Sequence, residues 1–395
     1  MANRGGASVV LVVLCSSLLG FAPRPGAAGK PLVPAMFVFG DSLVDVGNNN
    51  HLASVNDSCK ANYRPYGVDY HPGQSPTGRF SNGYNLADHL ARWLGFAGSP
   101  PPFLSLANAR ARHTRRTTVS TGINFASGGS GLLPTTGDSV CGGPVVSMAE
   151  QVGNFTSLVR TTTWEGSKRR ERTAPGLVSE SLVFISVGSN DLFEYSDFFA
   201  DPKNRNVSRN DTAFLGGLVA LYTAYVKDLY AAGATKFCVV SPSLVGCCPS
   251  QRKIAQDTHD VDGFGCLGTA NNLSRQLYPM IGSMLESLSQ DELPGMKYSL
   301  GDAVAMAQWI FTHASTPPNN FTTPDRACCG SGDFGSGACN SSAPLCPNRS
   351  GFFFWDRFHP TETLAAVTAL QLFSDNGTFV HPINVQQLVA PSSRP

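Results

Sequence analysis

The stretch AMFVF, residues 35–39, runs directly into GDSL, residues 40–43. A continuous apolar run of this length predicts a strand covered on both faces, as in a parallel sheet. Such a strand would place Ser42 at its tip. A serine hydroxyl is a weak nucleophile until a base, donors to an oxyanion and a rigid support surround it. The role of Ser42 therefore depends on what other segments bring to the same place.

The other segments alternate between strand-like and helix-like patterns. Further strands are expected at residues 122–126, 182–187, 236–240 and 296–300, and helices at residues 82–94, 215–232, 270–288 and 361–373. This alternation is typical of a parallel sheet with helices on both faces. The expected fold is an α/β protein, a three-layer α/β/α sandwich with a five-stranded parallel sheet of flavodoxin-like architecture. No linker divides residues 29–395, so they are expected to form a single domain.

Four polar motifs lie along this framework. They are GDSL at residues 40–43, NFASGGSG at 124–131, VGSND at 187–191 and WDRFHPTE at 355–362. The first three accompany the ends of predicted strands. Because the carboxyl ends of parallel strands face one side of an open sheet, these three motifs are expected to converge there.

The fourth motif contains the acid and base that Ser42 would need. His359 is the candidate general base, and Asp356, three residues earlier, can hold the imidazole tautomer and stabilise the imidazolium. Activity is then expected to fall below about pH 6, where a histidine of ordinary pKa becomes protonated. His381 also precedes a proline, but no carboxylate lies three residues before it.

The second and third motifs contain donors for an oxyanion. The backbone N–H of Gly128 or Gly129, the side-chain amide of Asn190 and the N–H of Ser42 are the candidates. Each has a structural alternative, because a glycine-rich run is often a simple turn and Asn190 could cap a helix.

Three aspartates in the same motifs are expected to brace loops rather than to do chemistry: Asp41, Asp45 and Asp191. Asp41 and Asp45 would also repel a phosphate after the first strand, which argues against a flavodoxin-type electron carrier. The absence of a G-x-S-x-G motif argues against an α/β-hydrolase nucleophile elbow.

The N-terminus has the layout of a secretory signal peptide over residues 1–28. Arg4 precedes an apolar stretch at residues 9–21 and small residues at 26–28. That stretch is shorter than the roughly 20 residues of a membrane span, and no longer apolar run follows. The sequence predicts cleavage near Ala28, no transmembrane segment and export.

Cysteines and sequons agree with export. Ten cysteines follow the leader: Cys59, Cys141, Cys238, Cys247, Cys248, Cys266, Cys328, Cys329, Cys339 and Cys346. They predict disulfides of undetermined pairing, with Cys238 as a candidate free buried thiol. A zinc site in the cluster at 328–346 is the alternative, although paired histidines are lacking. The glycosylation candidates are Asn56, Asn154, Asn206, Asn210, Asn272, Asn320, Asn340, Asn348 and Asn376.

The composition narrows the class of protein. Hydrophobic residues make up 42%, charged residues 14%, and the formal net charge is +1, so a nucleic-acid partner is not expected. The basic stretches at residues 110–116 and 168–172 are expected to be solvated loops. Contact with an anionic cell-wall polymer or lipid headgroups is the alternative.

The four motifs resemble the conserved blocks of plant GDSL-type esterase/lipases, within the SGNH hydrolase superfamily. The similarity extends over residues 34–373 and includes FSNG at 80–83 and CCG at 328–330. The resemblance implies Ser42 as nucleophile and His359 as base, supported by Asp356. It implies Ser42, Gly128 and Asn190 as the oxyanion hole, with Gly128 favoured over its neighbour.

The resemblance also implies a function. We expect a serine esterase or lipase, secreted to the apoplast or cell wall, that hydrolyses small-molecule, lipid or cell-wall esters through an acyl-enzyme, without cofactor or metal. The alternatives are an acyltransferase that uses the same acyl-enzyme and a non-catalytic wall- or lipid-binding glycoprotein. The acyl chain, the alcohol and the oligomeric state do not follow from the sequence.

Overall fold

The computed structural model of the 395-residue chain describes residues 30–71, 76–107, 121–161, 174–314 and 321–391. The predicted leader, both basic stretches and the sequon asparagine Asn320 lie outside these residues. No helix in the described segments is both long enough and apolar enough to cross a membrane.

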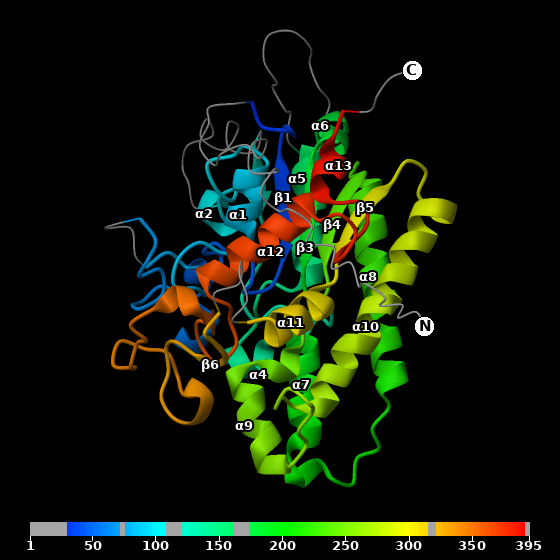
Figure 1. Ribbon diagram of the computed structural model, residues 1–395. Coiled ribbons are helices and arrows are strands. Elements are labelled where there is room, and N and C mark those ends of the chain that lie inside the picture. The colour runs from blue at the N-terminus through cyan, green and yellow to red at the C-terminus, as the bar shows by residue number, and fades with distance from the viewer. Residues whose placement is uncertain (1–29, 72–75, 108–120, 162–173, 315–320, 392–395) are drawn as a thin grey trace, which may run out of the picture.

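A six-stranded sheet in the order β2-β1-β3-β4-β5-β8 forms the centre of the fold (Figure 1). Its strands are β1 (Met36–Gly40), β2 (Gly122–Asn124), β3 (Leu182–Ser186), β4 (Lys236–Val240), β5 (Lys297–Gly301) and β8 (Val380–Pro382). The first five pair in parallel, as the sequence predicted. Strand β8 was not predicted and pairs antiparallel with β5. A separate small sheet pairs β6 (Thr323–Ala327) with β7 (Phe352–Phe354).

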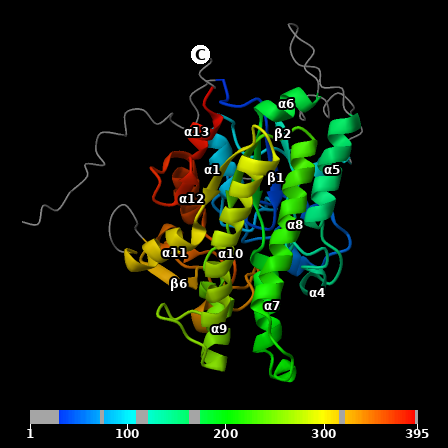
Figure 2. The same ribbon diagram turned by 90° about the vertical axis from the view of Figure 1, so that its right-hand side faces the viewer.

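Helices cover both faces of the main sheet. They are α1 (Leu86–Trp93), α2 (Phe103–Ala107), α4 (Asp138–Cys141), α5 (Met148–Thr161), α6 (Ala174–Glu180), α7 (Ser189–Ala200), α8 (Asp211–Ala231), α9 (Pro249–Thr258), α10 (Gly268–Ser287), α11 (Ala303–Thr312), α12 (Glu362–Ser374) and α13 (Val385–Val389). In β1, Phe37 packs in the cluster of α5, α8 and α10, and Val38 in that of α1, α12 and α13. Figure 2 shows α12 and α13 on one side of β1 and α5 and α8 on the other.

Capping residues fix where two of the predicted helices begin and end. Helix α1 begins at Leu86, four residues later than predicted, because Asn85 and Asp88 form a reciprocal capping box. The segment before it is therefore a loop that can approach the fourth motif. Helix α8 begins after Asn210, whose side chain accepts the N–H of Ala213, and ends two residues before Gly233.

Four disulfides tie the loops around the sheet: Cys59–Cys141, Cys247–Cys266, Cys328–Cys346 and Cys329–Cys339. The last two use all four cysteines of the cluster at 328–346, so these sulfurs do not form the alternative zinc site. Cys238 is free and buried, as predicted, and Cys248 is a second free and buried cysteine, which the sequence did not single out. The described residues contain no group of three or more side chains suited to a metal ion.

Candidate active site

The tip of β1 is held rigidly beneath Ser42. Gly40 has φ of +147°, and a Cβ there would lie 2.0 Å from the carbonyl oxygen of Ser186 on β3, so only glycine fits. The buried side chain of Gln151 accepts the N–H of Gly40 (2.8 Å) and donates to its carbonyl (2.9 Å). The N–H of Asp41 is donated to Ser186. Sequence reasoning missed Gln151, which lies on α5, more than 100 residues away.

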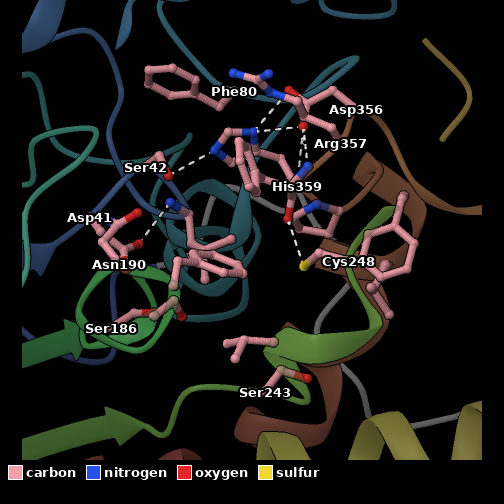
Figure 3. Close-up of a pocket in the computed structure, with 18 of the residues that line it drawn as sticks. Asp41, Ser42, Phe80, Ser186, Asn190, Ser243, Cys248, Asp356, Arg357 and His359 are labelled. Atoms are coloured by element: carbon pink, nitrogen blue, oxygen red, sulfur yellow. Dashed lines mark hydrogen bonds and ion pairs between the residues drawn. The ribbon is translucent and has the colours of Figure 1, made fainter. Parts of the chain in front are cut away.

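His359 lies between Ser42 and Asp356 (Figure 3). Its Nε2 is 2.8 Å from Ser42 Oγ, and its Nδ1 is 2.8 Å from Asp356 Oδ2. Asp356 is only 2% exposed, and its Oδ1 also accepts the backbone N–H groups of Phe358 and His359. Burial raises the pKa of Asp356, but the imidazole and the N–H donors outweigh it and hold that pKa below the ordinary value. The carboxylate is therefore ionised and oriented towards the imidazole.

The loop that carries His359 is short, and hydrogen bonds hold it at both ends. Strand β7 leads into it, and the N–H of Trp355 is donated to the carbonyl of His359 at 2.7 Å. Thr361 then caps α12 by accepting the N–H of Leu364. These contacts explain how an imidazole more than 300 residues from Ser42 is positioned against it.

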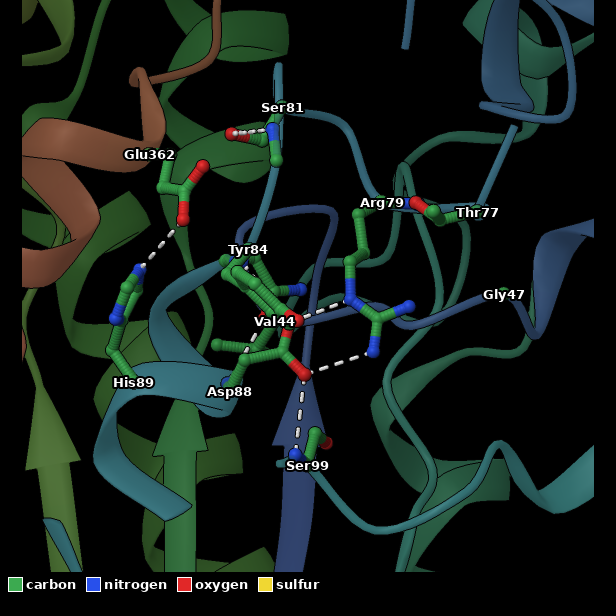
Figure 4. A network of polar contacts seen from close by, with 12 residues as sticks. Val44, Gly47, Thr77, Arg79, Ser81, Tyr84, Asp88, His89, Ser99 and Glu362 are labelled. Atoms are coloured by element: carbon green, nitrogen blue, oxygen red, sulfur yellow. Dashed lines mark hydrogen bonds and ion pairs between the residues drawn. The ribbon is translucent and has the colours of Figure 1, made fainter. Parts of the chain in front are cut away.

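The loop before α1 supports the imidazole from its other side. The Phe80 ring lies over the His359 ring, with centroids 5.0 Å apart and planes inclined by 31°. Arg79 anchors this loop through a two-point ion pair with the buried Asp88 of α1 (Figure 4). The carbonyl oxygen of the Asn82 side chain accepts the N–H of Glu362, so the FSNG motif also contacts the start of α12.

Tyr66 adds a further group that the sequence did not indicate. Its buried hydroxyl donates to Asp356 Oδ2 at 2.7 Å. The two residues are 290 positions apart, and no local spacing connects them. Because the donor stabilises the ionised carboxylate that faces His359, Tyr66 is a positioning residue for Asp356.

Replacing Tyr66 with phenylalanine is expected to lower kcat/KM for p-nitrophenyl butyrate about tenfold or more, the usual effect of losing a hydrogen bond to a charged group. The acid limb of the pH profile should also move to higher pH, because the His359–Asp356 pair with one donor fewer holds its proton more tightly. Tyr230→Phe, which removes a hydrogen bond to Pro294 far from the site, is the control. A lower Tm with an unmoved acid limb would show that Tyr66 is only structural.

One of the candidate oxyanion donors, the N–H of Gly128, is already engaged by a carboxylate. The N–H of Gly128 is donated to Asp45 Oδ2 at 3.1 Å, away from the cavity. Gly129, with φ of +87°, lines the cavity beside Ser42 instead. Of the two positions that the sequence left open, the geometry favours Gly129.

Asn190 also lines the cavity, from the first turn of α7. Gly188 is the N-cap of α7 and Asn190 is the second helical residue, so the capping alternative for Asn190 is wrong. Its amide nitrogen donates to the carbonyl of Ser130 at 2.9 Å. An amide nitrogen has two hydrogens, and this bond fixes the amide while leaving the second for a ligand.

The three other aspartates brace loops, as predicted. Asp45 accepts the backbone N–H groups of Gly47, Asn48 and Gly128. Asp191 accepts the backbone N–H groups of Leu132 and Leu133, in the loop that follows β2. Asp41 accepts the N–H of Leu43. Burial raises the pKa of Asp41 to about 7 and those of Asp45 and Asp191 to about 6, against the opposing effect of the N–H donors.

The sheet is mainly parallel and lies between helical layers, and Ser42 follows β1, the strand next to the edge strand β2. This arrangement is consistent with the architecture of SGNH hydrolases. The family model for GDSL-like lipases/acylhydrolases matches residues 36–372. One GDSL esterase/lipase of Arabidopsis thaliana is 33% identical over 389 residues, covering 97% of this chain and 98% of that protein. Another GDSL esterase/lipase of Arabidopsis thaliana is 37% identical over 366 residues, covering 92% of this chain and 87% of that protein. The chain belongs to the GDSL-like lipase/acylhydrolase family, a family of hydrolases, and the resemblance noted from the motifs is confirmed.

Proposed function

We propose that the protein is a secreted serine esterase that hydrolyses acyl esters through an acyl-enzyme on Ser42. One observation carries the proposal: His359 lies within 2.8 Å of both Ser42 Oγ and Asp356 Oδ2, through its two different ring nitrogens. A proton on Nδ1 is held by the carboxylate, which leaves the Nε2 lone pair directed at the serine hydroxyl.

The reaction would proceed in two halves. Ser42 Oγ attacks the ester carbonyl carbon while its proton passes to His359 Nε2. The tetrahedral intermediate then breaks its bond to the alcohol oxygen, which leaves with the proton from Nε2. Water attacks the acyl-enzyme in the same way, its proton passes to Nε2, and Ser42 Oγ recovers that proton as the acid departs.

The negative charge of each intermediate needs donors that are already in position. We assign this role to the N–H groups of Ser42 and Gly129 and to the side-chain amide of Asn190. The Asn190 amide is held in place by Ser130, and the Gly129 backbone by its position next to the Asp45-anchored Gly128. Preorganised donors lower the barrier because they need no rearrangement as the charge develops.

We further propose that residues 1–28 are a leader and that residues 29–395 form one domain, exported to the apoplast or cell wall. Four disulfides support an oxidising compartment. Most of the sequon asparagines are exposed: Asn56, Asn206, Asn210, Asn272, Asn340, Asn348 and Asn376. Asn154 is half-buried on α5. Glycosylation at these positions is part of the same proposal.

A fluorophosphonate probe tests the proposal directly. The native protein should be labelled once, on the peptide that contains Ser42, and turnover of p-nitrophenyl acetate should be lost in step with labelling. The heat-denatured protein and His359→Ala should react far more slowly, because the serine is then unactivated. A well-folded protein that neither reacts nor hydrolyses the ester would instead be a binding glycoprotein.

A further inference from the structure

We infer that a blind apolar chamber beside Ser42 receives the acyl chain of the substrate, and that this is an extended chain of medium length. The inference deepens the proposed function, on which it rests, by naming the substrate class. The chamber is the inner part of a cavity of about 260 Å³ that Ser42, Asn190 and His359 also line. Figure 3 shows Ser42 at one end of this pocket and Ser243 and Cys248 at another.

One face of α11 forms a wall of the chamber. The helix contributes residues at positions 303, 306, 307, 310 and 311, which is the spacing of a single helical face. Over this face the helix rises about 12 Å. Two of these wall residues are alanines, Ala303 and Ala307, and a third, Ala365, comes from α12. Their small side chains are the reason that the space between the two helices is not filled.

Several residues of the other walls are apolar and buried, whereas the charged lining residues Glu194, Asp197 and Arg357 are partly or fully exposed. The buried ones include Val240 at the end of β4, Leu244, Phe354 of β7 and Leu364 of α12, each less than 9% exposed although each borders the cavity. A cavity whose lining is buried from bulk solvent at its inner end is blind there. The group that enters must therefore come from the Ser42 side.

Two serine hydroxyl groups of the lining are already engaged. The hydroxyl of Ser241 donates to the carbonyl of Gly301, and that of Ser243 donates to the carbonyl of Ala303. With their protons committed to backbone acceptors, these side chains offer no donor to a ligand. A sugar or other polyol would lose its hydrogen bonds with water on entering, whereas a hydrocarbon chain would not.

The order of the reaction steps favours the acyl group, rather than the alcohol, as the part of the ester that occupies the chamber. After the first half-reaction the alcohol must leave and water must replace it, while the acyl group stays bound to Ser42. A blind chamber suits the group that stays, and the wider mouth, lined by exposed Ser58 and Val140, suits the group that exchanges. The α11 wall, which extends over about 12 Å, suits an extended acyl chain of medium length.

Two isomeric esters test this assignment on the native enzyme. Ethyl octanoate and octyl acetate have the same formula and the same ester bond, but carry the chain on opposite sides of it. In a pH-stat assay, kcat/KM for ethyl octanoate should exceed that for octyl acetate by more than tenfold. Equal rates, or a preference for octyl acetate, would overturn the inference. If neither ester nor p-nitrophenyl acetate is hydrolysed in a Ser42-dependent way, the proposed function itself fails.

A variant in which a larger side chain fills the chamber provides a second test. Ala307→Leu should reduce the ratio of p-nitrophenyl octanoate to p-nitrophenyl acetate turnover at least tenfold while acetate turnover is retained. Ala305→Leu adds the same side chain to α11 at a position that does not line the cavity, and it should leave the ratio unchanged. If Ala307→Leu is folded and lowers both esters equally, or changes neither, the chamber does not hold the acyl chain. The isomer comparison decides the question if that variant does not fold.

Discussion

A protein in which alanine replaces Ser42 is expected to hydrolyse p-nitrophenyl butyrate with kcat about 10⁶-fold below that of the native enzyme. The acyl-enzyme cannot form without the hydroxyl, and the oxyanion donors alone retain only a small part of the rate enhancement. The fold should not change. The rigid tip of β1 depends on Gly40, Gln151 and the backbone of Asp41, and among the described residues the Ser42 hydroxyl hydrogen-bonds only with His359.

The control for this substitution is Ser54→Ala. Ser54 is an exposed serine near the mouth whose hydroxyl donates to the carbonyl of Pro144. That variant should keep native kcat and KM, and both variants should keep the native Tm within a few degrees. Ser42→Ala with more than a hundredth of native kcat, after trace native enzyme is excluded by fluorophosphonate titration, would remove Ser42 from the mechanism.

The parallel sheet could be predicted because β1, β3 and most of β4 are continuous apolar runs and because strand-like segments alternate with helical ones along the chain. Other elements lacked such a signal. Helix α11 is apolar on nearly every side because it packs between two clusters, so it has no amphipathic period. Helix α9 is polar and buries Gln251 and Arg252 instead of an apolar stripe. Strand β8 has three residues, two of them exposed, and exists only because β5 lies beside it.

The site could be predicted as far as the topology determines it. Ser42 and Asn190 follow parallel strands, so their convergence needs nothing beyond the sheet, and Asp356 and His359 are neighbours in sequence. The proposed assignment of Gly129 rather than Gly128 rests on the Asp45 carboxylate, 83 residues from Gly128, which accepts the N–H of Gly128. Such a contact is determined by tertiary packing and not by local spacing.

The apolar residues near the site were also hard to assign from the sequence. From the sequence alone, seven apolar residues could either line an acyl groove or serve ordinary packing: Phe103, Leu104, Leu132, Leu133, Phe193, Phe198 and Phe199. Only Phe193 lines the cavity. The remaining walls come from α11, α12 and β7, which approach one another through long-range contacts and carry no motif.

Replacing Asp356 with asparagine is expected to lower kcat about 10⁴-fold, although the two side chains have the same shape. Asp356 Oδ1 accepts the backbone N–H groups of Phe358 and His359, so an asparagine would keep its oxygen there. Its NH₂ group would then take the place of Oδ2, between the Tyr66 hydroxyl and His359 Nδ1. The measurement is kcat for p-nitrophenyl butyrate at pH 7 to 8.

The loss follows from the tautomer that this arrangement imposes. Nδ1 lies 2.8 Å from Oδ2 and 2.9 Å from Oδ1, and Oδ1 already accepts two backbone N–H groups. With an NH₂ donor in place of Oδ2, the tautomer in which Nδ1 accepts is favoured, so the imidazole proton moves to Nε2 and points at Ser42 Oγ. Nε2 then has no lone pair with which to take the serine proton. Asp257→Asn, the same substitution at an exposed position paired with Lys253, should be silent. Folded Asp356→Asn protein with kcat within tenfold of native would mean that His359 does not need the carboxylate and that its tautomer is set by another group.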